Sequence, residues 1–129
     1  MVSQTLTSKL VKKFIPPRRL NSKKGDNGKV LVVGGSYMYH GAPILSTLAA
    51  LRMGSDLVYT AVPKNNVQST RAISPNLIVI PLADSKLTRG AVRKLLGQIP
   101  VGIDSATIGM GLVIQDVEAL KLLVKSLLD

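Results

Sequence analysis

One segment, residues 24–54, constrains the fold most strongly, because it holds a strand, a glycine-rich loop and a helix in immediate succession. The unbroken run of β-branched residues and leucine at residues 30–33 predicts a strand buried on both faces of a parallel sheet. Gly34 and Gly35 follow, and they end that strand at a point where no Cβ fits. A short loop then leads into the helix.

The helix after this loop is marked at both ends. Pro43 lies in its first turn, where a proline is tolerated, and Gly54 terminates it. Most side chains between these two positions are apolar, so almost no polar face remains: Ile44, Leu45, Leu48, Ala49, Leu51 and Met53. We therefore predict that the helix is buried, either within the fold or against another subunit.

The glycine loop is a candidate binding site. Backbone N–H groups and the positive end of a helix dipole meet there, which favours an anionic ligand. Gly34, Gly35 and Gly41 could equally serve only to let the chain turn, and the sequence leaves both interpretations open. The loop lacks the G-x-G-x-x-G pattern of dinucleotide-binding folds, and the Gly28-Lys29 pair precedes the strand, so it is no phosphate loop.

The remaining chain alternates between strand and helix patterns. Further strands are predicted over residues 57–62, 77–82 and 106–108, with helices over residues 66–73, 89–97 and 116–128. The predicted helix caps are Asn65 or Asn66, Thr88 and Asp116, and Pro81 indicates an edge position for the third strand.

This alternation predicts a doubly wound α/β fold with a mostly parallel sheet and helices on both faces. Ligands of such sheets bind at the carboxyl ends of the strands. The first glycine turn and a second one, Gly109-Met110-Gly111, both follow predicted strands and should lie at that edge.

The beginning of the chain is strongly basic. We predict a flanking helix and loop over residues 1–23, with the helix at residues 6–15 ended by Pro16 and Pro17, and an α/β domain over residues 24–129. Much of the net charge of +10 falls in this flank, but Phe14 is its only aromatic residue, so no platform for stacking bases is visible. We expect a solvated basic face that can attract a phosphate-bearing ligand.

Few residues can carry acid, base or metal chemistry. His40 could shuttle a proton beside Tyr37 and Tyr39, although a lone loop histidine is more often a bystander. Asp104 could orient the second glycine turn, although a simple loop carboxylate is the more common case. The acidic residues show no metal-ligand spacing.

Two absences narrow the class of protein. Cysteine is absent, which excludes disulfides and thiolate chemistry. No apolar run reaches membrane-spanning length, and the N-terminus lacks the apolar segment of a signal peptide, so we expect a cytoplasmic protein.

Several short motifs together carry a family resemblance. In chain order they are Lys24-Gly25-Asp26-x-Gly28-Lys29-Val30, Gly34-Gly35-Ser36, Tyr39-x-Gly41-Ala42-Pro43, Ala49-Ala50-Leu51-Arg52-x-Gly54, Ala61-Val62-Pro63, Ser74-Pro75-Asn76-Leu77 and Ile108-Gly109-Met110-Gly111-Leu112. The series resembles the ADP/ATP-dependent NAD(P)H-hydrate dehydratases, a branch of the ribokinase-like superfamily. It runs from residue 16 to about residue 116 and corresponds to the N-terminal half of a family member, so we expect a truncated ribokinase-like fold.

The resemblance implies an enzyme that repairs hydrated NADH or NADPH. Such enzymes phosphorylate the added hydroxyl group at the expense of ADP or ATP and then eliminate phosphate, and Mg²⁺ is an expected cofactor. By resemblance the hydrated nicotinamide would lie against small residues of this chain: Ser36, Gly41, Ala42, Gly109 and Gly111. The catalytic base and the nucleotide site belong to later family segments. No catalytic or metal-binding residue is therefore expected here, and the nucleotide-binding residues are unknown.

The resemblance also implies a homo-oligomer or a complementing C-terminal half, and a chain that is inactive alone. It is imperfect, because Met110 stands in place of a family proline and Val113 in place of a glycine. A valine cannot follow a positive-φ glycine path without strain, so the turn or its fit to the dinucleotide should differ. Two other classes remain open: a ribokinase-like small-molecule kinase, and a non-catalytic basic module that binds nucleic acid or an acidic partner.

Overall fold

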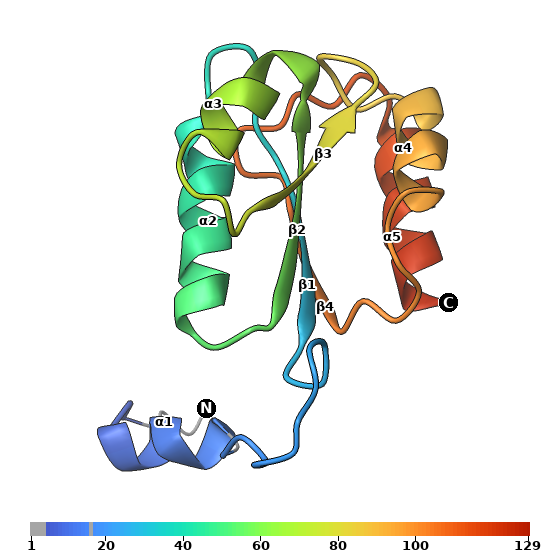
Figure 1. Cartoon of the computed structure of the whole chain (residues 1–129). Coiled ribbons are helices and arrows are strands. Elements are labelled where there is room, and N and C mark those ends of the chain that lie inside the picture. Colours follow the sequence, from blue (N-terminus) through green and yellow to red (C-terminus); the bar gives the residue numbers. More distant parts are fainter. Residues whose placement is uncertain (1–4, 16) are drawn as a thin grey trace.

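The computed structural model describes residues 5–15 and 17–129, so predictions that rest on residues 1–4 or on Pro16 lie outside the described residues. The elements along the chain are α1 (Ser8–Phe14), β1 (Lys29–Val33), α2 (Gly41–Arg52), β2 (Leu57–Pro63), the 3-10 turn η1 (Lys64–Asn66), α3 (Val67–Arg71), β3 (Ile78–Leu82), α4 (Arg89–Leu96), β4 (Ser105–Ile108) and α5 (Val117–Leu128) (Figure 1). No described helix has both the length and the apolar character needed to cross a membrane.

The four strands form one parallel sheet in the order β3-β2-β1-β4. Helices α2 and α3 cover one face of the sheet, and α4 and α5 cover the other (Figure 1). The chain builds the sheet outward from β1 to β3 and then returns to place β4 on the other side of β1. The predicted doubly wound α/β fold is therefore confirmed.

The centre of the sheet is the strand that the sequence predicted to be buried. Leu31, Val32 and Val33 of β1 are fully buried between the two helix layers. Removing such a side chain from water contributes about 1.5–3 kcal/mol. The predicted position of Pro81 is also confirmed, because β3 is an edge strand of this sheet and an edge residue needs no second hydrogen-bonding neighbour.

Helix α2 is only half covered. Its buried residues are Pro43, Ile44 and Thr47, whereas Leu45 on the outer face is 68% exposed and Met53, just after the helix, is 64% exposed. The prediction that this helix is buried within the fold is therefore wrong for its outer face. Burial of that face against another subunit stays a prediction.

Two predicted helix caps are confirmed. The Thr88 hydroxyl accepts a hydrogen bond from the Ala91 N–H, and the Asp116 carboxylate accepts one from the Glu118 N–H. The helix predicted to run to residue 73 is shorter, because a 3-10 turn precedes α3 and α3 ends at Arg71. Asn66 occupies the cap position there, but its side chain makes no capping hydrogen bond.

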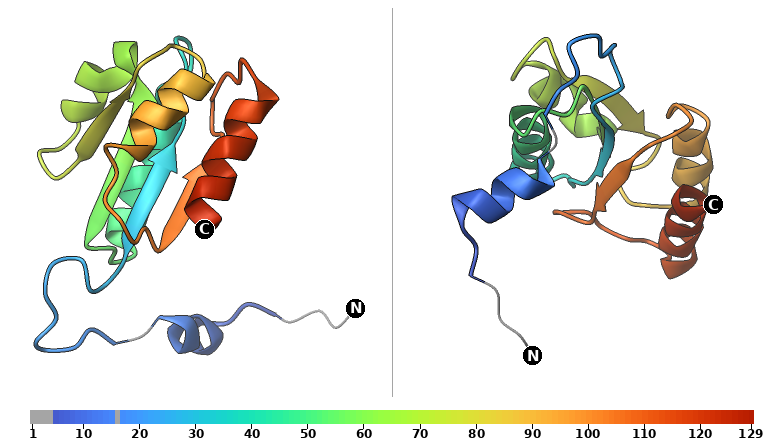
Figure 2. Two further views of the ribbon diagram at one scale, coloured as in Figure 1. Left: turned by 90° about the vertical axis from the view of Figure 1, so that its right-hand side faces the viewer. Right: turned by 90° about the horizontal axis from the view of Figure 1, so that it is seen from below.

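The basic flank lies beneath the amino ends of the strands. Figure 2 shows α1 set apart from the sheet and joined to it by an extended loop. No residue of α1 is buried, and Phe14 at its end is 75% exposed. This arrangement agrees with the predicted flanking helix, while the boundary at residue 23 stays a prediction.

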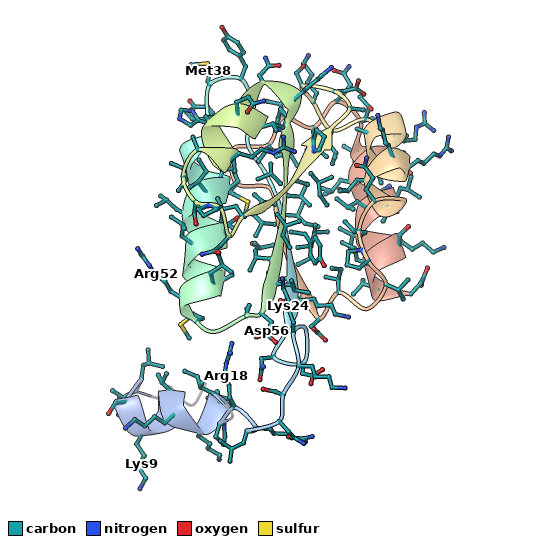
Figure 3. All side chains as sticks on the ribbon, viewed as in Figure 1. Lys9, Arg18, Lys24, Met38, Arg52 and Asp56 are labelled. Atoms are coloured by element: carbon teal, nitrogen blue, oxygen red, sulfur yellow. The ribbon has the colours of Figure 1, made fainter. Side chains whose placement is uncertain are left out.

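Asp56 joins this flank to the sheet. Its carboxylate accepts hydrogen bonds from the Gly25 N–H, the Asn27 N–H and the Asn27 side-chain amide, each at 3.0 Å, and pairs with Arg18 at 3.0 Å (Figure 3). The hydrogen bond from the Asn27 backbone, with further contributions from the other donors, lowers the pKa of Asp56 below its ordinary value of 3.8, against the opposing effect of burial.

We expect Asp56→Asn to lower the free energy of unfolding at pH 7, because the ionised carboxylate gathers four donors that a neutral amide cannot replace. A lowered folded-state pKa gives stabilisation that is complete above 3.8 and is lost as the pH falls through the folded-state value. The gap between wild type and variant should therefore close in that acidic range.

Urea unfolding at a series of pH values measures this gap. Asp104→Asn is the matched control, because the Asp104 carboxylate accepts one hydrogen bond, from the Lys29 N–H at 2.8 Å, at the same end of the sheet. A variant at Asp56 that is as stable as the wild type at pH 7 would contradict the role given to this carboxylate.

Candidate functional site

The candidate site lies at the carboxyl ends of β1 and β4, the two neighbouring strands whose following helices pack on opposite faces of the sheet. β1 and β4 are neighbours, with Val33 paired to Ile108, yet β1 leads into α2 on one face of the sheet and β4 leads into α5 on the other. In doubly wound folds the crevice for a ligand opens at such a switch point, beyond the carboxyl ends of the strands. The two predicted glycine turns follow these two strands, so the structure brings them together as expected.

Backbone hydrogen bonds join the two turns directly. The Gly35 N–H donates to the Met110 carbonyl at 2.8 Å, and the Gly109 N–H donates to the Val33 carbonyl at 3.0 Å. A further bond from the Leu112 N–H to the Gly109 carbonyl, at 3.0 Å, closes the second turn. The two turns therefore form one connected backbone surface.

Three of the glycines are required by packing. A Cβ on Gly34 would lie 2.6 Å from the Met110 sulfur and 2.7 Å from its carbonyl oxygen. A Cβ on Gly111 would lie 2.8 Å from the Tyr39 Cβ, and both Gly111 and Gly35 have positive φ angles, of 67° and 86°. Of the three glycines for which the sequence left a turning role open, Gly34 and Gly35 are therefore required by the turn, whereas Gly41 is not.

Two other glycines border open space. A Cβ on Gly41 or on Gly109 would meet no atom within 4 Å. Both residues are exposed, as is Ala42, which follows Gly41 in the first turn of α2. The first N–H groups of a helix have no partner within the helix, so this small-residue surface offers backbone donors to a ligand.

Ser36 is placed differently from the other predicted site residues. It is only 5% exposed, and its hydroxyl accepts a hydrogen bond from the Tyr39 N–H at 3.3 Å. The Ser36 N–H in turn donates to the Tyr39 carbonyl at 2.9 Å. Ser36 therefore shapes the loop from inside, and its side chain is not on the open surface.

The side chains at the tip of the loop point outward. Tyr37, Met38 and Tyr39 are between 62% and 79% exposed, and Met38 marks the end of the molecule opposite Arg18 in Figure 3. His40 is exposed at the position before α2 and makes no capping hydrogen bond with its side chain. None of the ion pairs within residues 5–15 and 17–129 includes His40, so a proton-shuttle role stays a prediction.

The carboxylates nearest to the carboxyl edge are already engaged. Asp84 accepts a hydrogen bond from the Thr88 hydroxyl, and Asp116 pairs with Arg89 at 2.9 Å while capping α5. Asp104 immediately precedes β4, and its carboxylate accepts a hydrogen bond from the Lys29 N–H at the start of β1, at the opposite end of the sheet from the glycine turns. The idea that Asp104 orients the second glycine turn is therefore wrong.

No set of three or more histidine or acidic side chains within residues 5–15 and 17–129 could hold a metal ion. These described residues therefore offer magnesium no carboxylate cluster of their own.

A separate apolar hollow of about 320 Å³ runs along the outer side of β4. Its lining combines strand residues with the last turns of α5: Ile103, Asp104, Ser105, Ala106, Ile108, Val124, Leu127 and Leu128. Three of the four β4 residues are exposed although they belong to the sheet. The β4 side of the sheet is therefore open, in contrast to the buried centre.

Comparison with known proteins decides the family. A family profile described as NAD(P)H-hydrate dehydratase matches residues 30–128. The chain belongs to the NAD(P)H-hydrate dehydratase family. It is 72% identical over 129 residues to the ADP-dependent (S)-NAD(P)H-hydrate dehydratase of Nitrosopumilus maritimus, and 71% identical over 119 residues to the enzyme of that name from Cenarchaeum symbiosum.

The match covers nearly all of this chain but less than half of each of these dehydratases. It takes in 100% and 92% of this chain, but 45% and 42% of the two relatives, so the chain spans less than half of their length. A ribokinase-like superfamily protein from Enterococcus faecalis has the same fold, with a TM-score of 0.70 and 27% identity over 93% of this chain and 40% of that one. A hypothetical protein from Streptococcus mutans gives a TM-score of 0.75 at 28% identity, over 95% and 42% of the two chains.

The structure resolves the two departures from the family pattern. No described residue other than glycine has a positive φ, so Val113 avoids the strained path, and its carbonyl accepts the Leu87 N–H at 2.8 Å. The sulfur of Met110, which stands in place of a proline, packs against Gly34. The second turn is therefore accommodated without a third glycine.

We expect Gly111→Ala to lower the free energy of unfolding by roughly 1–3 kcal/mol, because alanine is strained at a positive φ and its Cβ would collide with Tyr39. Gly41→Ala is the matched control, since its Cβ enters open space at a helical position, and it should leave stability unchanged or slightly raised. Urea unfolding measures both. Equal effects of the two substitutions would refute the division of glycines into packing and surface roles.

Proposed function

We propose that this chain binds the hydrated dinucleotide in an ADP-dependent NAD(P)H-hydrate dehydratase. The observation that carries the proposal is the joining of two glycine turns at the switch point of the sheet, in a chain 72% identical to an enzyme of that name. The hydrated nicotinamide would lie over Gly41, Ala42 and Gly109, where no side chain intervenes. Gly111 and Ser36 would support this surface from below.

The residues have distinct tasks in this proposal. The exposed start of α2, at Gly41 and Ala42, would donate backbone N–H groups to an anionic part of the dinucleotide. The absence of a Cβ at Gly41 and Gly109 would let the ligand approach the backbone closely. The chain thus supplies binding and orientation, which account for a large part of the rate in phosphoryl transfer.

The nucleotide in this proposal is ADP, because the two relatives that share more than 70% identity with this chain are named as ADP-dependent. The terminal phosphoryl group of ADP would pass to the hydroxyl oxygen of the hydrate, with loss of the hydroxyl proton and release of AMP. Phosphate and a proton of the ring would then leave in the elimination that restores the dihydronicotinamide. Magnesium would accompany the nucleotide phosphates, since the described residues offer it no cluster. A cytoplasmic location belongs to the same proposal.

We also propose that the open side of β4 receives the rest of the enzyme. The relatives are more than twice as long as the matched region, and an exposed strand edge beside an apolar hollow is suited to pairing with a further strand. A C-terminal half, in the same or a separate polypeptide, is the occupant we favour. A homo-oligomer through the outer face of α2 is compatible with this arrangement.

We expect Ala42→Leu to weaken binding of NADPH hydrate at least tenfold without unfolding the chain, because Ala42 is exposed at the start of α2 and the added side chain would project over the glycine surface. Ala49→Leu is the matched control, as it adds the same side chain to an exposed position near the other end of the helix. Calorimetric titration with each protein gives the affinities, and circular dichroism verifies folding. Unchanged affinity in a folded Ala42→Leu variant would rule out this surface as the binding site.

We expect the chain alone to show no dehydratase turnover with NADPH hydrate, ADP and magnesium. The carboxylates at the carboxyl edge, Asp84 and Asp116, are bonded to Thr88 and Arg89, so neither is free to act as the base. Recovery of the dihydronicotinamide absorbance measures turnover, first without and then with the C-terminal half of the Nitrosopumilus relative. Turnover by the chain alone would show that a base is present among its own residues.

A further inference from the structure

One buried asparagine contacts the glycine loop from outside it. Asn66 is 4% exposed at the cap position of α3, yet its side chain turns away from that helix. Its Nδ2 donates a hydrogen bond to the Ser36 carbonyl oxygen at 2.8 Å, across 30 residues of sequence. Only the nitrogen of an amide can donate to a carbonyl, so the orientation of this side chain is fixed by its partner.

Asn66 is itself held firmly. Its backbone carbonyl accepts hydrogen bonds from the Thr70 hydroxyl at 2.7 Å and from the Ser69 hydroxyl at 2.9 Å. Its side-chain nitrogen lies 3.1 Å from the place that a Cβ on Gly35 would occupy, so the loop backbone rests against the amide. A buried polar group with all its neighbours in place is a rigid support.

The far end of the same loop is held by a second buried pair. The Thr47 hydroxyl donates to the Pro43 carbonyl at 2.8 Å and shares a hydrogen bond of 2.7 Å with the Thr60 hydroxyl. Both threonines are fully buried. Residues 36–43 are therefore fixed at both ends from the layer formed by β2, η1 and the inner side of α2.

The bond from Asn66 sets the direction of one peptide group. In a trans peptide the C=O and the following N–H point in opposite directions. Because Asn66 draws the Ser36 carbonyl inward, the N–H of Tyr37 is turned outward, on the exposed side of the loop. A rotated peptide would instead present the carbonyl oxygen, which repels an anion.

We propose that Asn66 is a positioning residue that holds the Ser36–Tyr37 peptide so that the Tyr37 N–H faces an anionic oxygen of the bound dinucleotide. The identity of the ligand rests on the function proposed above, whereas the orientation of the peptide does not. Asn66 acts through the loop and does not itself touch the ligand, because it is buried beneath Ser36 and Gly35.

Asn66→Asp tests the proposal with a side chain of nearly the same shape. At neutral pH it places a carboxylate oxygen where Nδ2 donated, so the Ser36 carbonyl loses its donor and meets a repelling oxygen. We expect amide exchange at Ser36 and Tyr39, the two N–H groups of the loop turn, to accelerate at least tenfold, and affinity for NADPH hydrate to fall roughly tenfold.

Lowering the pH supplies the discriminating measurement. A protonated carboxyl can donate to the Ser36 carbonyl, so slow exchange and affinity should return in Asn66→Asp as the pH falls. The wild type measured at each pH is the reference, because intrinsic amide exchange itself slows as the pH falls, and because His40, Tyr37 and Tyr39 of the same loop are present in both proteins. A role in filling space alone predicts no such recovery.

Ser69→Ala is the matched control, because it removes a hydrogen bond to the Asn66 carbonyl and leaves the side-chain amide intact. It should change loop exchange and affinity by less than twofold. Asn66→Ala removes the donor without adding a charge. It should show the same faster exchange and weaker affinity as Asn66→Asp at neutral pH, but no recovery at low pH. It also keeps the test available if Asn66→Asp does not fold.

Unchanged exchange at Ser36 and Tyr39 in Asn66→Asp, or in Asn66→Ala, would overturn the proposal. Wild-type chain that fails to bind NADPH hydrate would instead refute the proposed function, and the exchange measurement would still decide the role of Asn66.

Discussion

The hydrogen bond from the Gly35 N–H to the Met110 carbonyl joins two parts of the chain that lie far apart in sequence. It forms only because β4 pairs with β1 and because Gly34, Gly35 and Gly111 carry no side chains at the contact. The backbone surface at the carboxyl edge depends on this bond, since it holds the first turn against the second. A ligand that bridges both turns therefore meets a preformed site, and its binding need not bear the entropic cost of ordering two separate loops.

Much of this arrangement could be predicted from sequence, because local signals agree with the fold. The buried run of β1, the Thr88 and Asp116 caps and the edge position of Pro81 each follow from rules that act over a few residues. Both glycine turns were predicted at the same edge for a similar reason, since parallel strands have their carboxyl ends together. The class of ligand was inferred from the family motifs, because the periodic pattern of apolar residues predicts the elements of the fold and not what binds to them.

The parts that sequence reasoning missed are long-range contacts of single polar side chains. Asn66 was predicted as a helix cap, but its amide serves a loop 30 residues earlier. No sequence pattern singled out Asp56, yet its carboxylate accepts hydrogen bonds from donors within residues 18–27. Asp104 was placed near the wrong end of the sheet. Such contacts leave no periodic trace, because one side chain at one position carries each of them.

Pro81 makes the two edges of the sheet different. β3 and β4 are its two edge strands. Pro81 is exposed and has no N–H to donate to a further strand on the outer side of β3. The β4 side carries no proline and lies beside an apolar hollow. Pro81 therefore opposes the pairing of a further strand with β3, and the corresponding edge at β4 has no such block. The same residue that ends hydrogen bonding on one edge thus protects that edge from pairing with a second sheet and from aggregation.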